Sequence, residues 1–458
     1  MTHIYQYKLT IETTAPLAIN TGKRETGFDT ELARDVNNLP YIPATAIAGV
    51  WSHLVEAKYG LQCQQDWFGC IAPVTKPSKL IIFDGKVLDS RSKAVANFAD
   101  PTALQQDTVL SRLIENRPHH RERVSLNDRG VAKDTGKFDE LLLPSGVRFS
   151  IEFLFHADSD ADFAEVLALW TDKSFAFGSS TTNGLGQFKI VGSNMQCVDL
   201  AKGAKEADKL AEFKANIPVT NKISFADTQS IKLASLQLQA MDNWRYGTGT
   251  VLLGHSTPEH NVNVLPYSEP VITWNAANHA SFKEDQVVLC GSSIKGMLAH
   301  RLYYHYRRLT GDFAENYQDS DFIAETRPAE LNELLGFSGD SPDLQLAGNM
   351  IFSDSLVEYQ HTVIRHHNQI DRFTGGVRDG ALYSEELLYQ PNFNVDIWLK
   401  RPITDDTIKA ALKATLEDIQ AGLLPMGAGS GRGTSLVMQN SRKPSFINNE
   451  ILKSEANS

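Results

Sequence analysis

The sequence predicts an α+β protein made of two tandem ferredoxin-like domains. The first reason is an internal repeat: residues 39–50, LPYIPATAIAGV, reappear in degenerate form at 287–297 as VVLCGSSIKGM. Further landmarks follow in the same order, namely Asp84 with Asp354, Asp128-Arg129 with Asp371-Arg372, and Gly186 with Gly433. Two copies of one domain is the economical explanation of such an ordered set of matches.

The second reason is the order of the predicted elements. Residues 4–12 alternate between apolar and polar positions, as a half-buried strand does. Residues 43–59 predict a helix, because apolar side chains recur at helical spacing. Strands are then predicted at 80–83, 146–155 and 186–191, and a second helix at 161–170. Strand, helix, strand, strand, helix, strand is the ferredoxin-like order, and the second half repeats it.

These elements divide the chain into four parts. Residues 1–200 form the first domain, 201–230 a linker, 231–440 the second domain and 441–458 a polar tail. The linker is placed where an Ala/Lys/Glu-rich stretch passes into a loop-like one. A length of 458 residues fits two domains of the usual size.

Composition limits the classes of function. The net charge of −11 argues against a nucleic-acid binder whose whole surface is basic, so any such role must rest on local charge. The chain opens directly into a strand-like segment and has no long apolar run, so we expect a soluble, cytoplasmic protein without a membrane partner. Four scattered cysteines fit a reducing compartment, and Cys63 and Cys70 are expected to be thiols rather than zinc ligands.

One basic segment stands out in this acidic chain. Residues 117–137 hold two histidines, three acids and six basic residues: Arg117, Arg121, Arg123, Arg129, Lys133 and Lys137. The matching stretch of the second half, 365–372, contains Arg365 and Arg372 among histidines. Phosphate contacts of an RNA-binding surface are one explanation, and a solvated loop is the other.

Two glycine-rich runs, 177–186 and 426–434, could expose backbone amides to a phosphate chain. The residues concerned are Gly184, Gly186, Gly431, Arg432 and Gly433. Neither run has the ending of a Walker loop or the dinucleotide fingerprint, so nucleotide hydrolysis is unsupported. A tight helix-to-strand turn is the plainer alternative.

The segment 291–296 places Ser292, Ser293 and Lys295 at a predicted helix N-terminus, which favours phosphate binding. The first copy lacks the lysine at this place. We therefore expect the second copy to bind phosphate better, with an ordinary N-cap as the alternative.

This ordered set, seen twice, resembles the RAMP (repeat-associated mysterious protein) superfamily. The motifs are the helix start ending in Lys295-Gly296, the strand ending in Asp84, the segment 370–372 and the closing glycine-rich loop. More narrowly, the chain resembles the RRM-like backbone subunits of type III CRISPR effector complexes, two of them fused as in type III-D-like variants. The resemblance implies a ribonucleoprotein of antiviral defense. Its partners would be a guide CRISPR RNA, a complementary target RNA and other RAMP subunits.

The resemblance also implies inserted thumb hairpins, at 116–140 and 363–386, that displace one base pair of the guide–target duplex each. A loop aspartate of the family, matching Asp29 here, cuts the target beside the displaced nucleotide. Asp29 would act as general base or hold Mg²⁺ or another divalent cation. Asp35 is its nearest competitor, and a turn-forming carboxylate is the alternative role. Lys23 and Arg24 are candidate RNA-phosphate contacts.

The second copy departs from this pattern, since no aspartate lies between Arg245 and Lys283. Glu259, Glu269 or a histidine could substitute, but the simplest interpretation is a copy that binds RNA without cutting it. Two other functions stay open: a non-catalytic scaffold, and a guide-processing ribonuclease that would use His3 or His53.

Overall fold

The computed structural model describes residues 2–23, 30–72, 74–126, 132–160, 163–203, 206, 208–209, 225, 230–254, 262–316, 328–338 and 345–453. Two of the predicted site residues of the first loop, Arg24 and Asp29, lie outside these ranges, as do Arg129 and Glu259. Most of the predicted linker, 201–230, lies outside them as well.

The first half has the predicted ferredoxin-like sheet. Its central strand β1 (His3–Thr13) pairs antiparallel with β7 (Arg148–Ala157) on one side and with β8 (Phe188–Asp199) on the other. Strand β3 (Leu80–Ile82) adds to the outer side of β7. Across the sheet the four principal strands therefore lie in the order β8, β1, β7, β3, which are the fourth, first, third and second of them along the chain. This order confirms the ferredoxin-like fold expected from the sequence.

The second half repeats this order. Strand β9 (Ile231–Ala240) lies between β19 (Asn392–Leu399) and β20 (Val437–Gln439), and β15 (Met350–Phe352) pairs with the outer side of β19. The predicted tail returns to this sheet, because β21 (Phe446–Ile447) pairs with β9. Leu452, also in that predicted tail, is 5% exposed and joins the second core, so residues 441–453 belong to the domain.

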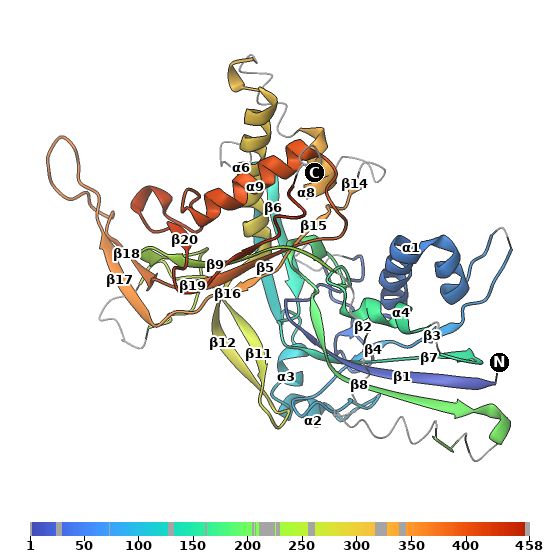
Figure 1. Cartoon of the computed structure of the whole chain (residues 1–458). Helices are drawn as coiled ribbons and strands as arrows, with labels where there is room; N and C mark the ends of the chain where they lie inside the picture. The colour runs from blue at the N-terminus through green and yellow to red at the C-terminus, as the bar shows by residue number, and fades with distance from the viewer. Residues whose placement is uncertain are drawn as a thin grey trace.

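Helices cover one face of each sheet (Figure 1). In the first half these are α1 (Ala44–Phe68) and α4 (Phe163–Ala168), and the Trp51 indole donates to the Val166 carbonyl oxygen at 2.9 Å. Helix α1 runs further than predicted and is interrupted at Gly60, whose φ of +86° suits glycine. In the second half α6 (Gly291–Thr310) packs against α9 (Asp406–Gln420), and its buried side chains Ile294, Leu298 and Leu302, which recur every four residues, join the second core.

Three of the described hairpins bear on the arrangement of the two halves. Strands β5 (His119–Leu126) and β6 (Ala132–Leu142) form one, and β17 (His361–His367) and β18 (Tyr383–Tyr389) form its counterpart. They coincide with the two predicted thumbs. The third hairpin pairs β11 (Ser268–Trp274) with β12 (Ala280–Leu289). The remaining elements are β2 (Tyr41–Ile42), β4 (Gly85–Val87), α2 (Pro101–Gln106), α3 (Leu110–Leu113), β10 (Asn243–Trp244), α8 (Asn332–Leu335), β13 (Phe337–Ser338), β14 (Gln345–Leu346) and β16 (Ser355–Leu356).

The β11–β12 hairpin joins the two halves. The backbone of Ile272 donates to the Ser145 carbonyl oxygen at 2.9 Å, and the Trp274 indole donates to the Gly146 carbonyl oxygen at 2.8 Å. The Arg148 guanidinium stacks 3.9 Å from the centre of the Trp274 ring. A Cβ on Gly146 would lie 2.0 Å from the Ile272 carbonyl oxygen, so this close approach requires glycine.

The landmark acids of the repeat have one structural role. Asp84 accepts from the backbone N–H of Ala44 at 2.7 Å, and Asp354 accepts from that of Gly291 at 2.8 Å, so each caps the first helix of its domain. The glycine-rich turns also match, but with a shift of two residues from the predicted pairing. Ser180 and Gly184 flank the first turn in left-handed conformation, as Gly429 and Gly433 flank the second, so Gly433 corresponds to Gly184 rather than to Gly186.

Candidate nucleic-acid interface

A groove of about 1850 Å³ opens where the β5–β6 hairpin of the first half meets the second half. Figure 1 shows this hairpin standing beside α6. Strand β5 and the residues before it line one wall, and the start of α6 and the loop 246–251 line the other. Its lining includes the basic side chains of Arg112, Arg117, His119, His120, Arg121, Arg123, Lys295 and His300.

Arg121 crosses from the first half into the second. Its Nε and Nη2 atoms lie 2.6 and 2.9 Å from the two carboxylate oxygens of Glu269, and Nη2 is also 2.6 Å from Asp354 Oδ2. The Arg121 side chain is 4% exposed. This differs from its predicted role as a phosphate contact, because both carboxylates already occupy the guanidinium at the junction.

Glu269 is the centre of this buried network. The Tyr267 hydroxyl donates to its Oε1 at 2.6 Å, and His119 Nε2 lies 3.5 Å from the same oxygen. Burial favours protonation of Glu269, but Arg121 and His119 outweigh burial and hold the pKa of this carboxyl well below its ordinary value. Its side chain is 2% exposed, which argues against the predicted alternative that Glu269 replaces a catalytic aspartate in the second copy.

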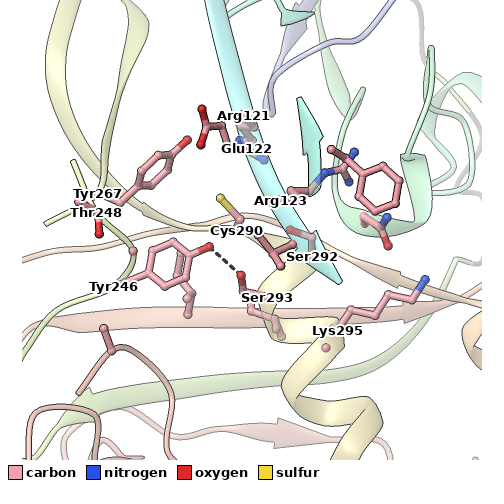
Figure 2. A pocket seen from close by; sticks show the side chains of 18 of the residues that line it. Arg121, Glu122, Arg123, Tyr246, Thr248, Tyr267, Cys290, Ser292, Ser293 and Lys295 are labelled. Atoms are coloured by element: carbon pink, nitrogen blue, oxygen red, sulfur yellow. Dashed lines mark hydrogen bonds between the residues drawn. The ribbon is translucent and has the colours of Figure 1, made fainter. Parts of the chain in front are cut away.

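The N-terminus of α6 faces the groove. Figure 2 shows Ser292, Ser293 and Lys295 at this helix start, with the Tyr246 hydroxyl hydrogen-bonded to Ser293 Oγ at 2.7 Å. Burial, followed by the nearby Cys290, raises the pKa of Tyr246 well above its ordinary value, so the hydroxyl keeps its proton and can donate. Three predicted phosphate contacts, Ser292, Ser293 and Lys295, therefore come together on one wall.

Arg123 lies on the opposite wall. Its guanidinium pairs with the Glu140 carboxylate across the hairpin and also donates to Ser180 Oγ at 3.1 Å. The Arg123 side chain remains 24% exposed, so it can still meet a phosphate. Arg117 also lines the groove, and Lys23 is exposed on the loop after β1.

The two glycine-rich turns have different surroundings. Gly184 is buried, and a Cβ there would lie 2.7 Å from the Phe352 carbonyl oxygen of the second half. Gly186 is buried too, against the Phe177 carbonyl oxygen. These two predicted RNA contacts therefore serve the junction and their own turn, and they do not present open amides.

In the second turn Gly431, Arg432 and Gly433 are exposed. Arg432 Nη1 donates to the Tyr383 hydroxyl at 2.5 Å, which ties this turn to the β17–β18 hairpin. Arg365 of that hairpin lies 3.6 Å from Asp242 Oδ2, and Arg372 is exposed near its tip. None of these residues lines the groove, so the predicted contacts form two separate surfaces.

Other candidate catalytic groups can be placed. Asp35 Oδ1 accepts from the backbone of Asn37 at 2.8 Å and of Leu39 at 2.9 Å, as a turn-forming carboxylate does. His53 is exposed on α1, and His3 lies 4.0 Å from Asp199. Among the described residues, no three His, Cys, Asp or Glu side chains come together in a geometry that could hold a metal.

The hydrogen-bond register aligns the loop that precedes the first helix in the two halves. Ala33 donates to the Ile19 carbonyl oxygen as Tyr267 does to that of Tyr246, each at 2.9 Å. Counting back from these pairs aligns Thr30 with Val264, and the residue before Val264 is Asn263. In sequence, the residue before Thr30 is Asp29, so an amide stands in the second copy where the first has a carboxylate.

Comparison with known proteins identifies the family. A family model described as the RAMP superfamily matches residues 10–189 and 283–437. The chain belongs to the RAMP superfamily. One matched region lies in each half of the chain, so these are tandem RAMP domains, as the resemblance of the sequence implied.

Solved structures are similar to part of the chain. One of them is described as a cryo-EM structure of the type III-B Cmr-beta bound to cognate target RNA, with 15% identity and a TM-score of 0.30. The similarity covers 42% of this chain and 60% of that chain. No curated protein matches the sequence. No helix within the described ranges is long and apolar enough to span a membrane.

Proposed function

We propose that this RAMP protein is a guide-RNA-binding backbone subunit of a type III CRISPR effector complex. The observation that carries the proposal is the junction groove, where basic, hydroxyl and aromatic side chains gather in a chain whose net charge is −11. A local concentration of positive charge on an otherwise acidic chain favours binding of a polyanion at that surface.

The groove suits a sugar-phosphate chain in detail. The α6 N-terminus offers the positive end of a 20-residue helix, with Ser293 and Lys295 beside it, although the Gly291 N–H group already donates to Asp354. Arg117 and Arg123 face it from the other wall. Phosphates can therefore be held from two sides, while Tyr246 and Tyr303 of the lining add aromatic surface for a base or sugar.

The test is RNA binding by the full chain over a series of salt concentrations. Lys295→Ala should weaken binding and reduce the log–log salt slope by about 0.7 to 0.9, the value of one phosphate contact. Lys283→Ala is the matched control, because Lys283 is exposed on β12 and does not line the groove. Equal effects of both variants would remove the groove as the binding site.

We further propose that the first domain is a metal-dependent endoribonuclease that cuts the target RNA through Asp29. A displaced nucleotide can place its 2′-hydroxyl in line with the scissile phosphate, and a nearby carboxylate can remove the hydroxyl proton. Mg²⁺ or another divalent cation would be held by Asp29 together with phosphate oxygens of the RNA, the hard oxygen ligands it prefers.

Cleavage of a complementary target by the guide-loaded chain tests this proposal. Asp29→Ala should abolish one cut and leave guide binding unchanged, and the wild-type product should carry a 2′,3′-cyclic phosphate. Asp35→Asn is the control, since Asp35 is a turn carboxylate in the same loop. Full cleavage by the Asp29 variant would place the chemistry on another residue of this chain, and absence of cleavage by the wild-type chain would leave it as a scaffold.

A further inference from the structure

The groove continues along α6 beyond the start of the helix. Its lining on α6 runs from Ser292 through Met297 to Tyr303, which is about 17 Å of helix. The later part of this lining is apolar and aromatic. The β5–β6 hairpin adds Val124 and Phe138 to the lining, and each of these side chains is 50% exposed. The groove therefore offers surface for bases as well as for phosphates.

The second half of α6 carries two pairs of an arginine and a tyrosine. The Arg301 guanidinium lies 4.6 Å from the centre of the Tyr304 ring, and the Arg307 guanidinium lies 4.6 Å from that of Tyr303. The Tyr304 side chain is 51% exposed. It follows the exposed His300 of the groove lining by four residues, so the two side chains share one face of the helix. An exposed ring with a guanidinium beside it suits stacking of an unpaired base.

Helix α9 holds the Tyr304 ring in place through its neighbours. Asp418 Oδ2 accepts from Arg301 Nε at 2.5 Å and lies 2.7 Å from His305 Nε2. The Tyr304 ring meets the His305 ring edge to face, with 5.1 Å between the ring centres. Because Arg301 and His305 are both fixed by one carboxylate, the tyrosine loses little conformational freedom when a base stacks on it.

The two arginines add little net charge to this face of α6. Arg301 pairs with Asp418, and Arg307 Nε lies 3.3 Å from Asp312 Oδ2. Since each guanidinium already has a carboxylate partner, it supports a ring and offers little to a phosphate. RNA binding at this face should therefore depend on stacking and vary little with salt concentration, in contrast to binding at Lys295.

The tyrosine pair belongs to the second domain alone. Counting from the capped first residue of each helix, Tyr303 and Tyr304 correspond to Glu56 and Ala57 of α1. Helix α1 is also interrupted at Gly60, whereas α6 continues through its 20 residues. The buried apolar positions recur at the same places in both helices, so the difference lies on the exposed side. Packing alone therefore does not account for Tyr304.

We infer that the face of α6 around Tyr304 binds unpaired bases of single-stranded RNA that continues out of the groove. The inference rests on the proposed function, because the groove must first hold the RNA. It adds a chemical preference to that function. Unpaired bases can stack on the tyrosine ring, whereas the bases of a duplex are stacked on one another, so single-stranded RNA should be preferred at this end of the groove.

Titration of the full chain with three RNAs tests the inference. The first is a short single strand, the second is the same strand lengthened by several unpaired nucleotides at both ends, and the third has these extensions paired to complementary strands. The wild-type chain should bind the second RNA at least about fivefold more tightly than the first, the contribution of one stacked base, and the third without this gain. Tyr304→Ala should abolish the gain and leave the salt dependence unchanged, and Tyr304→Phe should keep it.

Leu309→Ala is the matched control. Leu309 is also exposed on α6, at 43%, but it lies five residues further on and on another side of the helix, so its removal should leave the gain unchanged. Failure of the wild-type chain to bind the short RNA would refute the proposed function and, with it, the inference. Normal binding of the short RNA without a gain from unpaired extensions, or a gain that persists in Tyr304→Ala, would overturn the inference alone.

Discussion

Replacement of Arg121 by methionine should separate the two domains energetically. Methionine keeps most of the volume and removes the charge, so Glu269 and Asp354 would face each other at the junction without their shared cation. Removing one partner of a buried ion pair costs about 3 to 5 kcal/mol. Here Glu269 retains Tyr267 and His119, and Asp354 retains the Gly291 N–H group, which places the expected loss near the lower end, roughly 3 kcal/mol.

Thermal and urea unfolding followed by tryptophan fluorescence measure this loss. At roughly 2 to 4 °C per kcal/mol for domains of this size, the transition of the second domain should fall by about 6 to 12 °C. Weaker coupling should also split one transition into two, because the domains then unfold independently. Trp274, stacked on Arg148 at the junction, is a local reporter.

Arg112→Met is the matched control. Arg112 pairs with Glu115 three residues away, and the two side chains are 37% and 49% exposed, so its removal should cost less than about 1 kcal/mol. A loss of stability in Arg121→Met no larger than that in Arg112→Met would show that the junction does not depend on this buried ion pair. A double variant, Arg121→Met with Glu269→Gln, should recover part of the loss, because it also removes one of the uncompensated charges.

Three further outcomes are expected. The pKa of Glu269 lies below its ordinary value in the folded chain, so its contribution to stability is complete above the unfolded pKa, about 4.3, and is lost as pH falls below that value. In unfolding measurements at a series of pH values, the stability of Glu269→Gln should therefore fall less steeply below about pH 4.3 than that of the wild type. An unchanged slope would contradict the lowered pKa of Glu269. Joint neutralisation of Arg117 and Arg123 should lower the slope of log binding constant against log salt concentration by about 1.4 to 1.8, measured by titration of the chain with RNA. An unchanged slope would mean that these two arginines belong to a solvated surface and do not contact RNA. Asn263→Asp should add a second, metal-dependent cut to a long complementary target; mapping of the product ends checks it, and an unaltered pattern would mean that the second domain lacks more than the acid.

The fold could be predicted from the sequence because its determinants are local or repeated. Alternation in β1 and helical spacing in α1 depend on neighbouring residues, and the repeat supplied each signal twice. The correspondence of Asp84 with Asp354 was found in sequence, since both acids end a strand-like run, and the structure gives them the same capping role. The glycine-rich turns were misaligned by two residues, because a run of glycines offers several registers and only the backbone conformation of Gly184 and Gly433 selects one.

The candidate site was predicted less completely, and the reason is sequence distance. Arg121 belongs to a basic segment, and nothing local marks it as different from Arg117 or Arg123. Its partners, Glu269 and Asp354, lie 148 and 233 residues further along the chain. An isolated glutamate within a strand and a strand-ending aspartate are weak signals of a buried ion pair. The alternation of β5 offered one hint, since Arg121 and His119 lie on the same face of the hairpin.

The buried network changes what the basic segment means. If all of its arginines bound RNA, the two domains would lose the buried ion pairs at their junction and would be held by the β11–β12 hairpin, the first glycine-rich turn and the linker. Arg121 instead links the first hairpin to Asp354, the residue that caps helix α6 of the second domain. A buried cluster of one arginine and two carboxylates favours a single relative position of the two domains, because a shift would leave a buried carboxylate unpaired. The groove on which the proposed function depends is formed between the two domains, so its shape depends on their holding this arrangement. On that proposal, Arg121 supports RNA binding by fixing the arrangement of the domains rather than by touching a phosphate.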